Sequence, residues 1–211
     1  METIFNALTG NKGFSPYPYQ QSVAVSLFEG KNVILCAPTG AGKTWAAVLP
    51  FLANWKLEQQ FADRLIYVLP LRSLATSLYN DIRRACENAF NEVSEYKIRF
   101  QKRPYVTIQT GDQKDDPFFE GDIIFTTVDQ CLSSYLNMPV SLPQKVANIN
   151  AGAFIGSLIV FDEFHLLESD KAQKTAIEML IRLNPFSRFI IMTATLSSKS
   201  IDCLKSLLNA E

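Results

Sequence analysis

Residues 36–46 read CAPTGAGKTWA, and they continue an apolar run that begins at Val33. Gly40 and Gly42 lie in a turn, and Lys43 and Thr44 begin a stretch of helix-forming residues. Small residues let successive backbone N–H groups turn inward around an anion, and the N-terminus of the following helix adds its positive dipole end. This order of strand, glycine-rich loop and helix predicts a phosphate-binding loop.

The loop predicts particular contacts with a nucleotide. We expect Lys43 to reach the β and γ phosphates of ATP and the Thr44 hydroxyl to bind Mg²⁺. Position 37 is Ala, where the strictest form of the pattern has Gly. The alternative is a glycine turn without a ligand, which the flanking strand and helix disfavour. The expected nucleotide-binding residues are Pro38, Thr39, Gly40, Ala41, Gly42, Lys43 and Thr44.

A second polar cluster ends another apolar run, in the segment SLIVFDEFHLLES at residues 157–169. Asp162 and Glu163 follow this predicted strand, so we expect them at the same edge of the sheet as the phosphate loop. Asp162 is suited to hold Mg²⁺ through water, and Glu163 to orient and deprotonate the attacking water. An acidic turn that caps the next helix would explain the pair if it stood alone. The phosphate loop upstream favours an ATP-hydrolysing site instead.

Short apolar runs alternate with helical patterns along the chain. The runs are mostly unalternating and rich in Val and Ile, as expected for strands that are covered on both faces. They are residues 32–37, 65–69, 105–109, 123–126, 158–161 and 189–192. Apolar residues spaced by three and four predict helices over residues 71–93 and 172–183, and Pro50 should kink or shorten the helix that begins near Lys43. The pattern predicts an α/β domain with a mostly parallel sheet and helices on both faces.

Composition excludes several classes of protein. The chain has 211 residues, 21 acidic against 20 basic side chains and 47% hydrophobic residues, so we expect one domain with only local nucleic-acid contacts. Four separated cysteines indicate neither a zinc site nor a disulfide framework, and a single histidine excludes His-rich metal centres. The longest apolar run is too short for a membrane span, and no signal peptide is evident. A cytoplasmic protein without a membrane partner is therefore expected.

The segment Asp-Glu-Phe-His at residues 162–165 resembles the motif of the superfamily-2 helicases of DExH type, and further segments follow in that family's order. SPYPYQQ, residues 15–21, is similar to the adenine-reading Q motif, which implies that the Gln20 amide binds adenine. MTATLS, residues 192–197, is similar to the motif that links hydrolysis to strand movement. The resemblance implies a RecA-like P-loop NTPase domain in which His165 bridges the ATP site to Thr193 and Thr195.

Three more segments resemble the family's nucleic-acid motifs. They are LPLRSLA at residues 69–75, QTGD at residues 109–112 and TTVDQ at residues 126–130. The resemblance implies that these loops, rather than runs of charge, contact the nucleic acid. The basic residues Lys97, Arg99, Lys102 and Arg103 are interpreted as a solvated loop. The implied contact residues are Pro70, Arg72, Thr110, Gly111, Thr127, Asp129 and Gln130.

Thr-Val-Asp-Gln combined with Asp-Glu-Phe-His looks most like the CRISPR-associated helicases of type I interference, which act on single-stranded DNA. This resemblance implies single-stranded DNA and a CRISPR surveillance complex as partners. Many such relatives carry a His-Asp nuclease domain, but the only histidine here, His165, is followed by Leu166. Any cutting is therefore expected from a separate nuclease.

The family resemblance also implies a second RecA-like domain, in the same or another chain, whose Gln-x-x-Gly-Arg-x-x-Arg segment completes the ATP site. Only a helix-like stretch, residues 198–208, follows Thr195, so we expect residues 1–211 to form a single RecA-like domain that turns over ATP very slowly alone. Two alternatives stay open at this point. One is a DExH or DEAD-type RNA helicase domain, and the other is a non-motor module that binds ATP and regulates an assembly.

Overall fold

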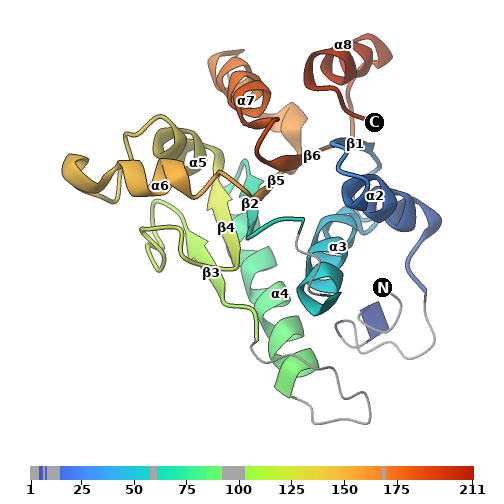
Figure 1. Cartoon of the computed structure of the whole chain (residues 1–211), viewed down its shortest axis with the longest axis horizontal. Coiled ribbons are helices and arrows are strands. Elements are labelled where there is room, and N and C mark those ends of the chain that lie inside the picture. Colours follow the sequence, from blue (N-terminus) through green and yellow to red (C-terminus); the bar gives the residue numbers. More distant parts are fainter. Residues whose placement is uncertain (1–4, 7, 9–14, 58–60, 92–102, 168–169) are drawn as a thin grey trace.

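Six short strands, rich in Val, Ile, Leu and Phe, pair into one parallel sheet within the described residues (Figure 1). They are β1 (Val33–Cys36), β2 (Leu65–Leu69), β3 (Val106–Gln109), β4 (Ile123–Thr127), β5 (Leu158–Phe161) and β6 (Arg188–Thr193). Their order across the sheet is β1-β6-β5-β2-β4-β3, and each pairing is parallel. The computed structural model describes residues 5–6, 8, 15–57, 61–91, 103–167 and 170–211. The predicted strands and the α/β class are confirmed.

Helices cover both faces of the sheet (Figure 1). One face carries α2 (Pro18–Phe28), α3 (Lys43–Leu57) and α4 (Arg72–Asn91). The other carries α5 (Val128–Tyr135), α6 (Asn148–Gly152), α7 (Asp170–Leu183) and α8 (Ser198–Leu208), with two 3₁₀ turns at η1 (Gln144–Val146) and η2 (Phe164–Leu166). Among the described residues, none of the helices combines the length and the apolar character that a membrane span requires.

The central strand β2 shows how the sheet separates two apolar cores. Its five side chains are all buried. Leu65, Tyr67 and Leu69 pack with α2, α3 and α4, whereas Ile66 and Val68 pack with the helices of the opposite face. Because side chains alternate along a strand, a strand buried on both faces needs apolar residues at nearly every position. Tyr67 is the one side chain of this strand with a polar group.

Pro50 lies inside α3, which continues to Leu57, so the proline does not end the helix. Proline removes one helical hydrogen bond and crowds the preceding turn. The neighbouring side chains Leu49, Phe51 and Leu52 are at most 1% exposed, so the helix retains its packing against the sheet through the proline. Burial of this face outweighs the local cost.

Parallel strands place their carboxyl ends along one edge of the sheet, and every segment named above as a motif after a strand lies there. The phosphate loop follows β1, Asp162 follows β5, and Thr193 ends β6, and these three strands are neighbours in the order β1-β6-β5. The segments after β2, β4 and β3 occupy the other half of the same edge. The strand order thus separates the predicted ATP residues from the predicted nucleic-acid residues.

Candidate nucleotide site

The phosphate loop joins β1 to α3 through two glycines in the left-handed region. Gly40 has φ +81° and Gly42 has φ +85°, which a residue with a Cβ adopts only with strain. The Ala37 N–H donates to the Thr193 carbonyl at 3.2 Å and the Ala41 N–H to the Pro38 carbonyl at 3.3 Å, so both ends of the turn are held. A Cβ at Gly40 would meet no atom within 4 Å among the described residues. The predicted loop is therefore present and open beside Gly40.

Lys43, the first residue of α3, is 6% exposed and pairs with Glu163. Its ammonium donates to Glu163 Oε1 at 3.0 Å and to the Ala37 carbonyl at 3.1 Å. A buried ammonium needs such partners because its desolvation is costly. The structure thus brings together two of the predicted catalytic residues.

Asp162 lies directly after β5 and is held from two sides. Its Oδ2 accepts from the Tyr67 hydroxyl at 2.7 Å, and its Oδ1 accepts from the Glu163 N–H at 2.8 Å. Burial raises the pKa of the Asp162 carboxyl, whereas both hydrogen bonds lower it. The net upward shift means that burial disfavours the ionised form, a cost that a nearby cation offsets.

Glu163 has a left-handed backbone, with φ 47° and ψ 45°. A non-glycine residue in this region costs of order 1 kcal/mol or more and is found most often at functional sites. Its Oε2 is buried without a hydrogen-bond partner among the described residues and lies 3.5 Å from His165 Nδ1. One oxygen of this carboxylate therefore still has capacity to accept.

The residue types at this edge fit a nucleotide with Mg²⁺. Hydroxyl and carboxylate oxygens, here from Thr44 and Asp162, are the donors that Mg²⁺ prefers, and it commonly takes only one or two of them from protein. The described residues hold no group of three or more His, Cys, Asp or Glu that would by itself bind a metal. The open loop beside Gly40 and the unpartnered Glu163 oxygen are the two observations that support a ligand here.

The predicted link from the acidic motif to β6 is observed at His165. This residue lies in η2, and its Nδ1 is 3.2 Å from Thr193 Oγ1. Thr193 is fully buried, and its carbonyl also binds the phosphate loop through Ala37. Thr195 is exposed, so the structure does not bring the second predicted coupling residue to His165.

Gln20 is buried and contacts the phosphate loop. Its Nε2 donates to the Gly42 carbonyl at 2.9 Å, and its Oε1 accepts from the Tyr17 N–H at the start of α2. The neighbouring Tyr19 hydroxyl donates to the Ala41 carbonyl. The structure therefore gives Gln20 a loop-holding contact that the motif alone did not indicate. Gln20 Nε2 also donates to the Tyr19 hydroxyl at 3.5 Å, so a donor bond to adenine would have to replace one of these contacts.

The predicted nucleic-acid residues on α4 and after β3 lie together. Arg72 Nη1 donates to Asp112 Oδ1 at 2.8 Å in an exposed pair. A Cβ at Gly111 would lie 2.7 Å from Arg72 Nη2, so the guanidinium packs directly on the glycine. Thr110 is 1% exposed, and its hydroxyl accepts from the Gln113 N–H, so its side chain faces its own turn. The Thr110 N–H also donates to the Gln113 carbonyl at 2.7 Å, so neither this group nor the side chain faces a nucleic acid.

The predicted nucleic-acid residues at the end of β4 and the start of α5 differ in exposure. Thr127 and Gln130 are buried, and Gln130 Oε1 has no partner among the described residues. Asp129 is exposed on the first turn of α5, where its negative charge would repel phosphate. Pro70, at the end of β2, is partly exposed.

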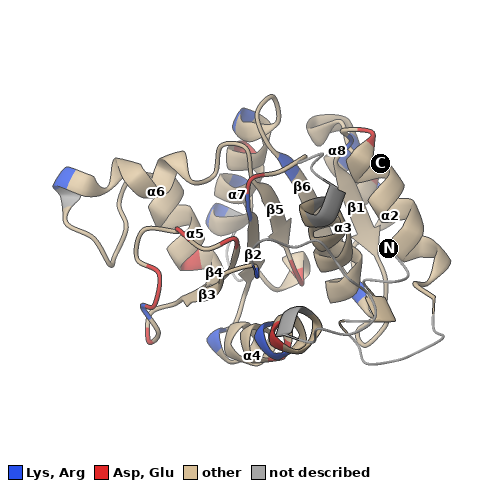
Figure 2. Ribbon diagram, turned by 60° about the horizontal axis from the view of Figure 1, so that its bottom comes forward, with Lys and Arg blue, Asp and Glu red and all other residues tan. Residues whose placement is uncertain are grey.

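Charge does not single out a nucleic-acid face. Figure 2 shows basic and acidic segments close together on α4. There the exposed pair of Arg83 with Glu87 follows helical spacing at 3.0 Å. Of the predicted basic segment only Arg103 is described, and it also lies near Glu87, at 3.8 Å. Lys97, Arg99 and Lys102 lie outside the described residues.

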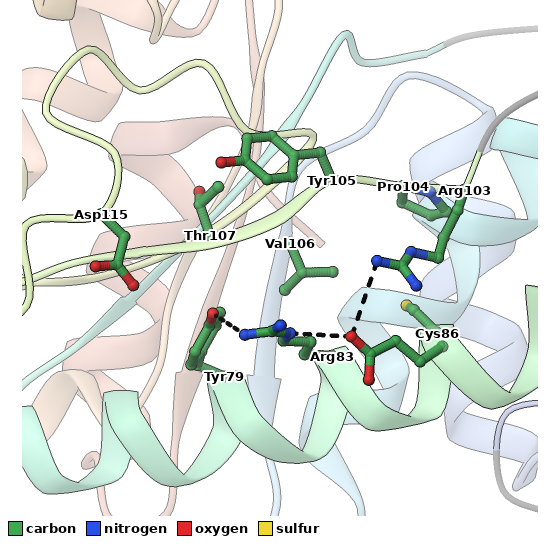
Figure 3. Close-up of a pocket in the computed structure, with 10 residues that line it drawn as sticks. Tyr79, Arg83, Cys86, Arg103, Pro104, Tyr105, Val106, Thr107 and Asp115 are labelled. Atoms are coloured by element: carbon green, nitrogen blue, oxygen red, sulfur yellow. Dashed lines mark hydrogen bonds and ion pairs between the residues drawn. The ribbon is translucent and has the colours of Figure 1, made fainter.

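A pocket of about 280 Å³ lies between α4 and β3 (Figure 3). In it Arg83 donates to the Tyr79 hydroxyl and to Glu87, which also pairs with Arg103. None of the predicted site residues lines this pocket. Arg83, Glu87 and Arg103 pair with one another, and the pocket's β3 residues come from the amino end of that strand, away from the carboxyl edge that holds the phosphate loop.

Tyr67 was missed by the sequence predictions. It is fully buried in β2, and its hydroxyl donates to Asp162 Oδ2 at 2.7 Å. A tyrosine within the otherwise aliphatic run LIYVL was the available indication, because a buried hydroxyl needs a partner. Which partner it has depends on the neighbouring strand.

A parallel sheet with a glycine-rich loop after β1 and an acidic pair after β5 defines a RecA-like P-loop nucleotide-binding domain. The chain belongs to the DEAD/DEAH box helicase family, whose sequence profile matches residues 17–204. This match covers the whole candidate site.

Relatives among characterised proteins are similar at a moderate level. The chain is 28% identical over 182 residues to the ATP-dependent helicase Lhr-Core of Methanocaldococcus jannaschii, covering 82% of this chain and 20% of the relative. It is 26% identical over 205 residues to the ATP-dependent DNA helicase Hel308 of Thermoplasma volcanium, covering 94% of this chain and 26% of the relative. The chain therefore spans about a fifth to a quarter of the length of these relatives.

Solved structures confirm the fold. The DUF1998 helicase MrfA bound to DNA and AMPPNP superposes with a TM-score of 0.71 at 20% identity, covering 100% of this chain and 28% of that one. The Mycobacterium smegmatis helicase Lhr bound to ssDNA and AMP-PNP gives a TM-score of 0.68 at 20% identity, covering 95% and 25%.

Proposed function

We propose that this domain binds ATP with Mg²⁺ and forms the first RecA-like half of an ATP-dependent DNA helicase or translocase acting on single-stranded DNA. The observation that carries the proposal is the convergence of Lys43, Glu163 and Asp162 at one edge of the sheet, with Lys43 and Glu163 joined at 3.0 Å. Membership of the helicase family and the DNA helicases among its relatives support it.

The contacts of Lys43 suggest how nucleotide binding prepares the site. Phosphates entering the loop compete with Glu163 for the Lys43 ammonium, because one buried cation serves both. Once released, Glu163 can hold the attacking water and take its proton. When bound, Mg²⁺ would neutralise charge on the phosphates, with Thr44 and, through water, Asp162 as its ligands. His165 contacts both Glu163 and Thr193, so a change in the contacts of Glu163 would alter the contact between His165 and Thr193.

A motor needs a second RecA-like domain that closes over the nucleotide and supplies arginine. We place that domain elsewhere in the protein or in another chain, consistent with the small share of the relatives that this chain spans. The isolated domain should therefore bind ATP weakly and hydrolyse it very slowly. DNA-stimulated hydrolysis by the isolated domain at a rate normal for a helicase, and lost in Lys43→Ala, would contradict this.

A place in CRISPR type I interference is the finer form of the proposal. It is supported by Thr-Val-Asp-Gln at residues 127–130 together with Asp-Glu-Phe-His at residues 162–165, and it implies a cytoplasmic protein that works with a surveillance complex and a separate nuclease. The test compares ATPase stimulation of the full-length protein by single-stranded DNA and by RNA of matched sequence, with Lys43→Ala as the inactive control. Preference for RNA would favour the RNA helicase alternative, which relatives such as the DEAD-box ATP-dependent RNA helicase CshB of Listeria monocytogenes represent.

A further inference from the structure

We propose that Tyr67 is a positioning residue whose hydroxyl fixes the Asp162 carboxylate, and so determines how tightly the site holds Mg²⁺ with ATP. The inference rests on the proposed function, since it concerns a predicted Mg²⁺ ligand. Tyr67 is fully buried within the sheet, so it acts through Asp162 and contacts neither phosphate nor metal.

The Tyr67 hydroxyl has no packing purpose. The ring is 0% exposed and packs against Phe125, with centroids 5.4 Å apart, and phenylalanine would fill this space equally well. Burying a hydroxyl costs free energy unless it is hydrogen-bonded. The hydroxyl is therefore explained by its bond to Asp162 Oδ2 at 2.7 Å, since its other neighbour, Met192 Sδ at 3.8 Å, is a weak acceptor.

Tyr67 lies on β2, whose residues pair in register with β5, so that Tyr67 is opposite Val160 and the Asp162 N–H donates to the Val68 carbonyl at 2.9 Å. A central strand that is buried on both faces thereby holds a ligand that follows the neighbouring strand. Groups that support a ligand in this way hold its orientation, and their loss typically costs about 10- to 100-fold in metal affinity or activity.

Asp162 keeps hydrogen-bonding capacity after these contacts. One hydrogen bond is made at each carboxylate oxygen, from Tyr67 and from the Glu163 N–H. Each oxygen keeps a lone pair, so the carboxylate is oriented and can still accept from a water on Mg²⁺.

The test is Tyr67→Phe, which keeps the ring and removes only the hydroxyl. Binding of a fluorescent ATP analogue to the 211-residue protein is measured across a Mg²⁺ titration and in EDTA. Mg²⁺ should enhance binding of the analogue, and we expect the Mg²⁺ concentration that gives half of this enhancement to rise about 10-fold in Tyr67→Phe. Binding in EDTA should be unchanged. Tyr79→Phe is the matched control, because its buried hydroxyl binds Arg83 on α4, and it should follow the wild type.

A double mutant separates positioning from a general loss of structure. If Tyr67 acts through Asp162, Tyr67→Phe should add little to the loss of Mg²⁺-dependent binding in Asp162→Asn. Thermal unfolding in EDTA should show that all variants are folded at the assay temperature. Independent, additive defects would overturn the inference. So would an unchanged Mg²⁺ requirement in Tyr67→Phe when the wild type shows one. A wild type without any Mg²⁺-dependent nucleotide binding would overturn the proposed function as well.

Discussion

Replacing Lys43 by Met should destabilise the nucleotide-free domain, apart from any effect on ATP. Met keeps the apolar stem of the side chain, so the change removes mainly the ammonium. Glu163 is then left 13% exposed beside Asp162 without its cation partner. Removing one partner of a buried ion pair costs about 3–5 kcal/mol, and this pair, which is not fully buried, belongs at the lower end, about 3 kcal/mol. For a chain of this size that corresponds to about 6–12 °C in unfolding temperature.

The assay is urea or thermal unfolding at pH 7 without nucleotide. Arg182→Met is the matched control: Arg182 pairs with Glu178 at 2.7 Å, but the two side chains are 67% and 55% exposed, so the loss should stay below about 1 kcal/mol. The double variant Lys43→Met with Glu163→Gln removes the uncompensated charge. It should recover more than half of the lost stability, because the two sites are in contact and their effects are not additive.

Two results would refute this reasoning. One is a Lys43→Met domain within about 0.5 kcal/mol of the wild type, which would mean that the pair does not form in solution. The other is a double variant as unstable as Lys43→Met alone, because the destabilisation would then come from lost packing and not from an unpaired Glu163.

Two further predictions concern glycine and a buried carboxylate. Gly42→Ala should destabilise the domain more than Gly40→Ala: both glycines are left-handed, but only at Gly42 does the added Cβ crowd Gln20, at 3.1 Å. Equal losses in urea unfolding would contradict the observed contact. Asp116→Ala should cost about 2–4 kcal/mol, because the 4% exposed carboxylate accepts hydrogen bonds from one side chain and two backbone N–H groups, whereas the exposed neighbour substitution Asp115→Ala should cost under about 0.5 kcal/mol. Similar losses at both positions would show that the loop before β4 is not anchored in this way.

Much of the fold was predictable from the spacing of apolar residues. The six runs of apolar residues became the six strands, and the periodic segments became α4 (Arg72–Asn91) and α7 (Asp170–Leu183). Pro50 shows the limit of local rules, since α3 continues through it. Local propensity gives way where a helix face is buried against a sheet, because the free energy of burial exceeds the cost of one lost hydrogen bond.

The candidate site was predictable in its residue types and less so in its contacts. The motifs gave Lys43, Asp162 and Glu163, and the structure brings them to one edge. The motifs did not indicate that Gln20 holds the phosphate loop or that Tyr67 holds Asp162. A contact between side chains on different elements depends on strand register and on which face each side chain occupies, and neither is written in a single segment.

The sequence by itself determined that a phosphate loop, an acidic pair and a threonine motif each follow a strand, and therefore lie at one edge of a parallel sheet. Only the tertiary structure decided the strand order β1-β6-β5-β2-β4-β3, which sets the ATP residues on three neighbouring strands and the predicted nucleic-acid residues on the other three. The physical reason is that strands buried on both faces are alike in their apolar sequence. Their neighbours are selected by the packing of the whole sheet and its helices rather than by any local pattern.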